Sequence, residues 1–285
     1  MEHKIILSAD STCDLGDELR RRYNVEYYPF HVILDGKMYG DGVDLVPDQL
    51  YQAFEEKHIL PKTAAINAAE YTEYFKQWTD QGYEVIHVTL GSGLSATYQN
   101  CCLAAESLPG VYPIDSRNLS TGSGLVVLEA ADRIAKGMPA ARIAQEVQEL
   151  TNRCHASFVI DTLEFLYKGG RCSALAMLGA NMLRLKPCIE VNNADGTMSV
   201  GKKYRGSLDK ALEQYVYDRL ANRADLDDRR VFITHSGISN ERIERVRRQV
   251  KKLADFKEIH VTRAGCTIST HCGPNTLGVL FMTKA

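Results

Sequence analysis

The feature that most constrains this 285-residue chain is the alternation of apolar strands with helices through its first half. Strand-forming runs at residues 4–9, 83–90 and 111–115 are separated by segments whose apolar residues recur at helical spacing. Strands that alternate with helices in this way form a parallel sheet covered by helices on both faces. The first half is therefore predicted to be an α/β domain.

The second half has a different pattern. Residues 188–204 predict a hairpin, because two extended runs flank an Asp-Gly turn, and the apolar segment Ser173–Leu185 predicts a helix. Further strands are predicted at residues 157–161, 231–235, 258–262 and 277–283, and further helices at residues 207–222 and 240–254. We therefore expect a two-domain α/β protein, with a parallel sheet in residues 1–155, a mixed sheet in residues 156–285 and a cleft between them.

Composition excludes several classes of protein. A net charge of −2 offers no electrostatic field to attract nucleic acid or an acidic membrane. No apolar run approaches the length of a membrane span, and the N-terminus has the pattern of a first strand rather than of a signal peptide. The eight cysteines include no CxxC pair, and most lie in apolar runs, which is typical of buried free thiols. These features predict a soluble protein of the reducing cytoplasm.

Motifs for a cofactor or a metal are also missing from the sequence. There is no GxxxxGK[ST] segment, and the Gly91-Ser92-Gly93 start of a dinucleotide-binding pattern has Ala96 where the last glycine belongs. The eight histidines include no HxxxH pair of the kind that binds zinc on a helix. We therefore predict neither a nucleotide cofactor nor a metal.

A turn of glycine and hydroxyl residues at 91–97 lies directly between the strand at 83–90 and a predicted helix. Backbone N–H groups at the N-terminus of a helix form a site for an anion. Similar turns occur at residues 8–12, 115–123 and 234–239. Because ligands of open α/β sheets bind beyond the carboxyl ends of the strands, several of these turns are predicted to line one cleft.

A serine hydrolase is one interpretation of this turn. Ser95, Asp115 and His271 occur in the order of an α/β-hydrolase triad, and Ser95 follows a strand and precedes a helix. The GxSxG pattern is only half met, because Thr97 replaces its second glycine, and Asp115 lies on the next predicted strand. A hydrolase or transferase that uses Ser95 with His271 and Asp115 is therefore the alternative to a binding protein.

Six segments, in order along the chain, carry a resemblance to a known family. They are DSTCDL (residues 10–15), GSGLSATY (91–98), IDSRNLSTGSGLVVLEA (114–130), DTLEFLYKGGRCS (161–173), KPCIEVNNADGTMSVGKKYRG (186–206) and HCGPNTLGV (271–279). Together they resemble the DegV family of fatty-acid-binding proteins, which includes the fatty-acid-binding subunits of bacterial fatty acid kinase. The resemblance extends over nearly the whole chain.

The resemblance implies a non-enzymatic lipid carrier built from two α/β domains. The acyl chain would be buried in the first domain, and its carboxylate near the cleft would be bound by Thr63 and Ser92, with Ser95 as the next hydroxyl of the turn. Arg171 and His271 correspond to cleft positions that engage the kinase or the acyl phosphate. The implied ligand is a long-chain fatty acid, the implied partner is a separate fatty acid kinase, and no cofactor is implied.

Two segments depart from the family pattern around the head group. The TSQPS-like segment is TAAIN (residues 63–67) here, and Gly91 and Ala96 replace the first serine and the glycine of the SSxLSGT-like turn. Each charge-assisted hydrogen bond lost in this way would weaken carboxylate binding by about 1.5–3 kcal/mol. Either backbone N–H groups and Asn67 replace the lost donors, or the preferred ligand differs from that of the family.

Overall fold

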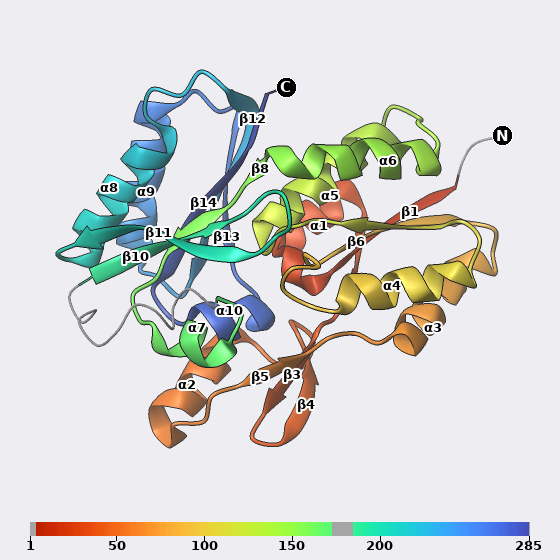
Figure 1. The fold of residues 1–285 in the computed structure, drawn as a ribbon, viewed down its shortest axis with the longest axis horizontal. Coiled ribbons are helices and arrows are strands. Elements are labelled where there is room, and N and C mark those ends of the chain that lie inside the picture. The colour runs from red at the N-terminus through yellow and green to blue at the C-terminus, as the bar shows by residue number, and fades with distance from the viewer. Residues whose placement is uncertain (1–3, 173–184, 285) are drawn as a thin grey trace.

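The computed structural model describes residues 4–172 and 185–284 (Figure 1). Its first half contains a four-stranded parallel sheet in the order β2-β1-β6-β7, which confirms the predicted parallel sheet. The strands are β1 (Ile5–Asp10), β2 (Val25–Tyr28), β6 (Glu84–Thr89) and β7 (Val111–Asp115). The helices around them are α1 (Gly16–Tyr23), α3 (Ala68–Thr79), α4 (Thr97–Glu106), α5 (Thr121–Ile134) and α6 (Ala140–Leu150).

The second half contains the predicted mixed sheet, in the order β11-β10-β9-β14-β12-β13, with β8 paired to β14. The strands are β8 (Cys154–His155), β9 (Ser157–Val159), β10 (Leu185–Val191), β11 (Met198–Arg205), β12 (Leu226–Ser236), β13 (Glu258–Arg263) and β14 (Thr276–Thr283). Helices α8 (Leu208–Leu220) and α9 (Asn240–Leu253) lie on the side of this sheet away from the parallel sheet (Figure 1). Because β8 pairs with β14, residues 154 and 155 belong to this sheet rather than to the first.

The predicted helix at Ser173–Leu185 lies outside the described residues, apart from Leu185, which begins β10. Within the described ranges, 4–172 and 185–284, no helix is both long and apolar enough to cross a membrane.

A small third sheet has the strand order β4-β3-β5. Its strand β3 lies in the same extended stretch of the sequence, residues 25–34, as β2 of the parallel sheet. Pro29 divides this stretch into β2 and β3 (His31–Leu34), since a proline cannot donate to a strand ladder. Strand β3 pairs on either side with β4 (Lys37–Gly40) and β5 (Lys62–Ala64). Helix α10 (Cys266–Cys272) packs against this sheet and against α2 (Pro47–Lys57), so a piece of the first half contacts the second half here.

Helix α5 joins the two halves of the molecule. All of its residues from Thr121 to Ala131 are buried, and it contacts β1 and β6 of the first sheet as well as β8 and β14 of the second. One hydrophobic cluster consequently extends across both halves, from Leu7 on β1 to Phe158 on β9 and Leu280 on β14. The second half also has a hydrophobic cluster of its own, formed by α8, α9 and the face of the mixed sheet that they cover, so the halves are joined through one of the clusters only.

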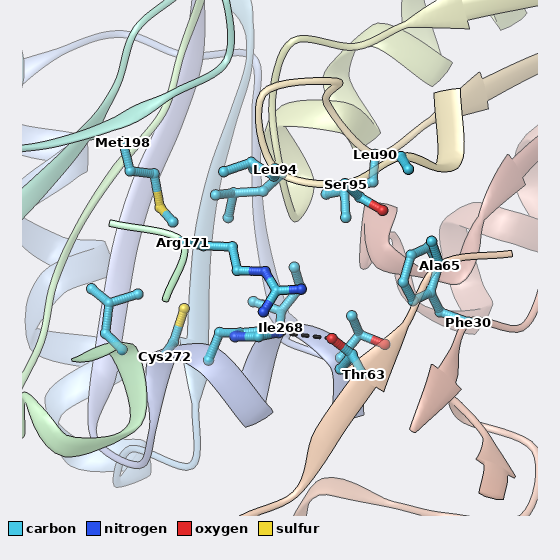
Figure 2. A pocket seen from close by; sticks show the side chains of 15 residues that line it. Phe30, Thr63, Ala65, Leu90, Leu94, Ser95, Arg171, Met198, Ile268 and Cys272 are labelled. Atoms are coloured by element: carbon cyan, nitrogen blue, oxygen red, sulfur yellow. Dashed lines mark hydrogen bonds between the residues drawn. The ribbon is translucent and has the colours of Figure 1, made fainter. Parts of the chain in front are cut away.

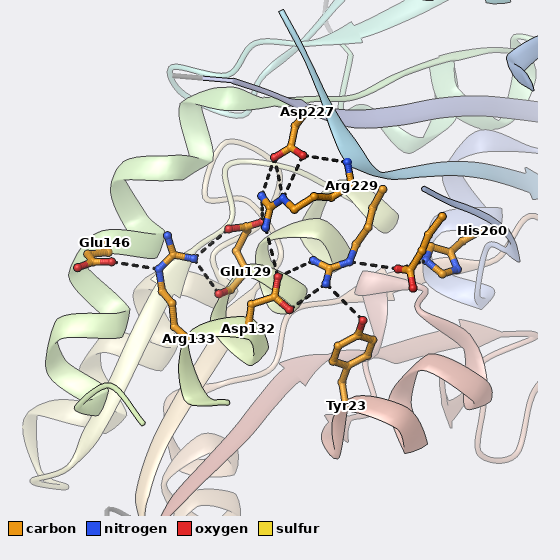
Figure 3. A network of polar contacts seen from close by, with 10 residues as sticks. Tyr23, Glu129, Asp132, Arg133, Glu146, Asp227, Arg229 and His260 are labelled. Carbon is orange, nitrogen blue, oxygen red and sulfur yellow. Dashed lines mark hydrogen bonds and ion pairs between the residues drawn. The ribbon is translucent and has the colours of Figure 1, made fainter. Parts of the chain in front are cut away.

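An ion-pair network ties the outer end of α5 to β12 (Figure 3). Asp132 accepts from both terminal nitrogens of Arg230, at 2.8 Å each, and Glu129 accepts from Arg229 at 2.5 Å. The Arg230 side chain is only 12% exposed, so its contacts with Asp132 are shielded from water more than those of an ordinary surface pair. The network adds a polar connection between the two halves beside the hydrophobic cluster that spans them.

Candidate functional site

A cavity of about 240 Å³ lies between the two halves of the chain (Figure 2). Of the fifteen described residues that line it, ten are apolar, among them Leu90 and Leu94 from the first half and Met198 and Ile268 from the second. The polar side chains among these fifteen are those of Thr63, Ser95, Arg171, Thr267 and His271. An apolar space with a few convergent polar groups is the usual form of a small-molecule site.

Thr63, Arg171 and His271 lie together at one end of this cavity. The hydroxyl of Thr63 on β5 and Nε2 of His271 on α10 are hydrogen-bonded at 2.9 Å. Arg171 lies just after α7 (Glu164–Gly169), and its guanidinium donates to the Gly169 carbonyl at 2.6 Å. The guanidinium points to the Thr63 side of the cavity (Figure 2). The structure thus brings together three of the residues singled out in the sequence.

Helix α10 presents Thr267, Ile268 and His271 to the cavity, and the first half of the chain fixes its position. Asp41 accepts from the backbone N–H groups of Cys266, at 2.6 Å, and of Thr267, at 3.0 Å. Asp14 accepts from the Gly265 N–H at 2.8 Å. These two buried carboxylates satisfy N–H groups that the start of a helix leaves without a partner.

The sequence analysis missed α10 and the two aspartates. The helix is short, and its β-branched residues Thr267, Ile268 and Thr270 are poor helix formers, so periodicity gave no signal. The sequence signal that could have indicated this helix is Gly273, because a glycine is common just after the C-terminus of a helix. In the structure Gly273 follows the last residue of α10 with a φ of 72°.

Buried Asp10 fixes both ends of the 91–97 turn. Its carboxylate accepts from the Leu90 N–H at 2.8 Å and from the Tyr71 hydroxyl at 2.5 Å, and Tyr71 is also bonded to the Thr97 hydroxyl at 2.6 Å. Between these anchors, Leu94, Ser95 and Ala96 line the cavity just before α4 begins. The turn therefore reaches the cavity as predicted.

Ser92 is placed differently from Ser95. Its N–H and its hydroxyl both donate to Asp115, at 3.0 and 2.6 Å, and it is not among the residues that line the cavity. A role of Ser92 in carboxylate binding stays a prediction.

The triad of the alternative interpretation is not assembled among the described residues. His271 Nε2 is bonded to Thr63 rather than to Ser95, and Ser95 Oγ accepts from the Thr97 N–H at 3.2 Å. Asp115 is occupied by Ser92 and by the Arg117 N–H and does not orient His271. A triad needs its base bonded to both the nucleophile and the acid, so this arrangement contradicts the triad hypothesis.

The departures from the family pattern have structural reasons. A Cβ atom at Gly91 would lie 2.7 Å from the backbone nitrogen of Asn118 and 2.9 Å from its oxygen, so this position has no room for a side chain. Asn67 accepts from the Glu70 N–H as the cap of α3 and does not line the cavity, so its side chain does not replace the lost donors there. Ile66 is buried in the core, and Ala65 is the member of this segment that lines the cavity with Thr63.

The polar end of the cavity favours an anion. Burial, and to a smaller extent repulsion by the Arg171 guanidinium, lowers the pKa of His271 to about 4. His271 is therefore neutral at pH 7, and Arg171 is the residue that brings a formal charge to the described cavity lining.

A second, narrow cavity of about 20 Å³ continues from the first toward the mixed sheet. Leu119, Ile268 and Cys272 line both spaces, and Phe158 and Leu280 line the extension. The open space thus lies between the halves and reaches into the second, whereas the resemblance led us to expect it within the first domain.

Comparisons with known proteins identify the family of this chain and solved structures of similar fold. A family model described as "Uncharacterised protein, DegV family" matches residues 4–284 of this chain. A DegV domain-containing protein from Caldanaerobacter subterraneus is 30% identical over 284 residues, which cover 99% of each chain. The structure of a DegV family protein from Thermus thermophilus, described as fatty acid binding, is 29% identical with a TM-score of 0.87 over 99% of this chain and 100% of that one. A fatty acid binding DegV family protein from Streptococcus agalactiae is 25% identical, with a TM-score of 0.84 over 99% and 100% of the two chains.

Proposed function

Because this chain belongs to the DegV family, we propose that it binds a long-chain fatty acid and does not act as an enzyme on it. The observation that carries the proposal is the mainly apolar cavity whose polar side chains Thr63, Arg171 and His271 gather at one end. The relative from Thermus thermophilus, which has the same fold, is described as fatty acid binding. A carboxylate with a long alkyl chain matches both parts of such a cavity.

The carboxylate would accept from the hydroxyls of Thr63 and Ser95 and would be attracted by Arg171. Helix α4 begins at Thr97, two residues after Ser95, so the positive end of its dipole also faces this part of the cavity. Ser92 would act indirectly by holding the turn to Asp115. His271 would orient the Thr63 hydroxyl through their hydrogen bond.

We further propose that the bound carboxylate is presented to a separate fatty acid kinase, which would form the acyl phosphate. Support comes from the family resemblance and from the position of Thr63, Arg171 and His271 beside an open groove. The test is phosphoryl transfer from ATP to protein-bound fatty acid in the presence of a purified fatty acid kinase. Transfer that is no faster than to free fatty acid would reject this part of the proposal.

Native mass spectrometry of protein purified from its own cells tests the ligand. We expect a mass increment that matches a fatty acid, which solvent extraction releases and chromatography identifies. An increment from another class of molecule would overturn the fatty acid assignment.

Replacing Thr63 with valine is expected to weaken fatty acid binding about tenfold, which corresponds to one lost hydrogen bond to a charged acceptor. The substitution keeps the side-chain shape, and affinity can be measured by titration with palmitate. The matched control is Thr72→Val on α3, which lies outside the cavity and whose hydroxyl donates to the Ala68 carbonyl. Equal affinities of Thr63→Val and the control would exclude Thr63 from the head-group site.

The hydrolase alternative makes a separate prediction. A nucleophilic Ser95 would be labelled covalently by a fluorophosphonate, whereas the observed geometry predicts no labelling above that of the Ser95→Ala variant. Specific labelling of Ser95 would reopen the enzymatic interpretation.

A further inference from the structure

Thr267 carries a buried hydroxyl that has no role in the proposed function. The residue is 2% exposed and lines the cavity, and its Oγ1 has no hydrogen-bond partner within the part of the chain that the structure describes. Buried polar groups in folded proteins almost always have a partner. Thr72 on α3 shows the usual arrangement for a helix, because its hydroxyl donates to the Ala68 carbonyl four residues earlier. The hydroxyl of Thr267 is therefore free to bond to a molecule in the cavity.

The position of Thr267 is fixed by the surrounding fold. Its backbone N–H donates to Asp41 at 3.0 Å, in the first turn of α10. Because α10 begins at Cys266, Thr267 has no helical carbonyl four residues earlier to which its hydroxyl could donate. A β-branched side chain also has few rotamers. The hydroxyl is thus held at one place in the cavity wall.

Nδ1 of His271 is the other buried polar atom without a partner in the described cavity lining. It faces Gly169, where even a Cβ atom would collide with this nitrogen, so no ligand atom fits between the two residues. Thr267 is consequently the one of the two that a ligand can satisfy.

A plain alkyl chain would leave the Thr267 hydroxyl unsatisfied. Water that enters an unfilled cavity can bond to a hydroxyl, whereas an alkyl chain that displaces this water cannot. A site that contains a buried polar group therefore discriminates strongly against a ligand that lacks the matching group. Thr267 favours a ligand with a polar atom on its acyl chain.

The surroundings of Thr267 favour a neutral polar group over an anion. Asp41 accepts from the N–H groups of Cys266 and Thr267, and Asp14 accepts from the Gly265 N–H, so these N–H groups at the start of α10 are already used. The Asp41 carboxylate would also repel a second carboxylate placed beside Thr267. A hydroxyl carries no charge and can either donate to or accept from a threonine.

The spacing along α10 places the matching hydroxyl close to the head group. Thr267 precedes His271 by four residues, so the two lie on the same face of the helix, about 6 Å apart along its axis. His271 is bonded to Thr63, where the carboxylate of the proposed ligand would lie. A distance of about 6 Å is spanned by about five bonds of an extended chain. The hydroxyl would therefore be on one of the first carbons after the carboxylate and not at the tail.

We propose that Thr267 is a specificity-determining residue, which selects a fatty acid hydroxylated near its carboxylate over the unsubstituted acid. This inference rests on the proposed function and narrows its substrate class. Thr63, Ser95 and Arg171 would bind the carboxylate, and Thr267 would bind the hydroxyl of the acyl chain.

The test compares palmitate with the two enantiomers of 3-hydroxypalmitate. We expect the wild type to bind one enantiomer at least tenfold more tightly than palmitate, because the fixed threonine satisfies a hydroxyl of one configuration. The Thr267→Val substitution keeps the side-chain shape and should reduce this preference to less than twofold. The wild type should bind 16-hydroxypalmitate, whose hydroxyl is at the tail, no more tightly than palmitate.

Thr270→Val is the matched control. Thr270 is on the same helix and also has a buried hydroxyl without a partner in the described structure, but it lines the open groove and not the cavity. This variant should keep the preference for 3-hydroxypalmitate. Unfolding in urea without ligand is a second measurement. Thr267→Val should be at least as stable as the wild type, because the hydroxyl that it removes has no partner.

Several results would overturn the inference. Equal wild-type affinities for palmitate and both enantiomers, or a preference that survives in Thr267→Val, would show that Thr267 does not recognise the hydroxyl. An equal loss of both ligands in Thr267→Val, or a loss of its stability, would assign the residue to the head group or to the fold. A similar gain with 16-hydroxypalmitate would place recognition at the tail. Palmitate binding in any of these cases leaves the proposed function standing, whereas a wild type that binds none of the acids would overturn both.

Discussion

Replacing Gly91 with serine is expected to destabilise the protein by about 3 kcal/mol, although serine is the residue that the family pattern has at this position. The new Cβ would lie 2.7 and 2.9 Å from the Asn118 backbone, well inside contact distance. The Gly91 N–H also donates to the Asn118 carbonyl at 2.8 Å, so the two backbones cannot separate without losing this bond. Relief would require moving the 91–97 turn, which carries Ser95.

The measurement is the free energy of unfolding in urea. Gly40→Ser is the matched control, because a Cβ at Gly40 meets Pro29 and Val43 at an ordinary 3.4 Å. We expect the control to lose at most about 1 kcal/mol. Similar stability of the two variants would show that the contact at Gly91 relaxes without cost. In that event the missing serine would again count as a lost donor at the site.

Acidification below pH 6.5 is expected to destabilise the ligand-free protein, in part through His271. Its folded-state pKa of about 4 is below the ordinary value of 6.5, so the unfolded chain binds a proton that the folded chain excludes. Stability from this group is fully present above pH 6.5 and is lost as pH falls toward 4. The total for His271 is on the order of 3 kcal/mol.

Unfolding free energies of the wild type and of His271→Gln between pH 7 and 4 measure this contribution. Glutamine cannot become charged, so the free energy of unfolding of the variant should fall by about 3 kcal/mol less than that of the wild type over this pH range. Burial also lowers the pKa of His155 and of His235 to about 4, and both histidines remain in the variant. Parallel profiles for the two proteins would show that His271 accepts a proton without cost.

The elements that follow from local pattern were predictable. Pro47 starts α2 where a proline is compatible with a first helical turn, and the spacing of Ile243, Val246 and Val250 gave α9. The Asp-Gly turn gave the β10–β11 hairpin for the same kind of reason. These signals lie within a few residues of one another and do not depend on the rest of the fold.

The small third sheet and α10 were not predictable from local pattern. Strand β5 is short and exists because β3 offers it a partner about thirty residues earlier, and α10 depends on Asp14 and Asp41 from the opposite end of the chain. Such elements are stabilised by long-range contacts that override weak propensity.

The sequence by itself determined the α/β class, the order of the two sheets and the residues of the 91–97 turn, because periodicity and turn chemistry act locally. It also named Thr63, Arg171 and His271, through the family resemblance. Only the tertiary structure decided that these three meet, that the cavity lies between the halves, and that Ser92 bonds to Asp115 while Ser95 lines the cavity. It also decided that Gly91 has no room for a side chain. The physical reason is that close packing and pairing between distant segments depend on three-dimensional distances, which no local pattern contains.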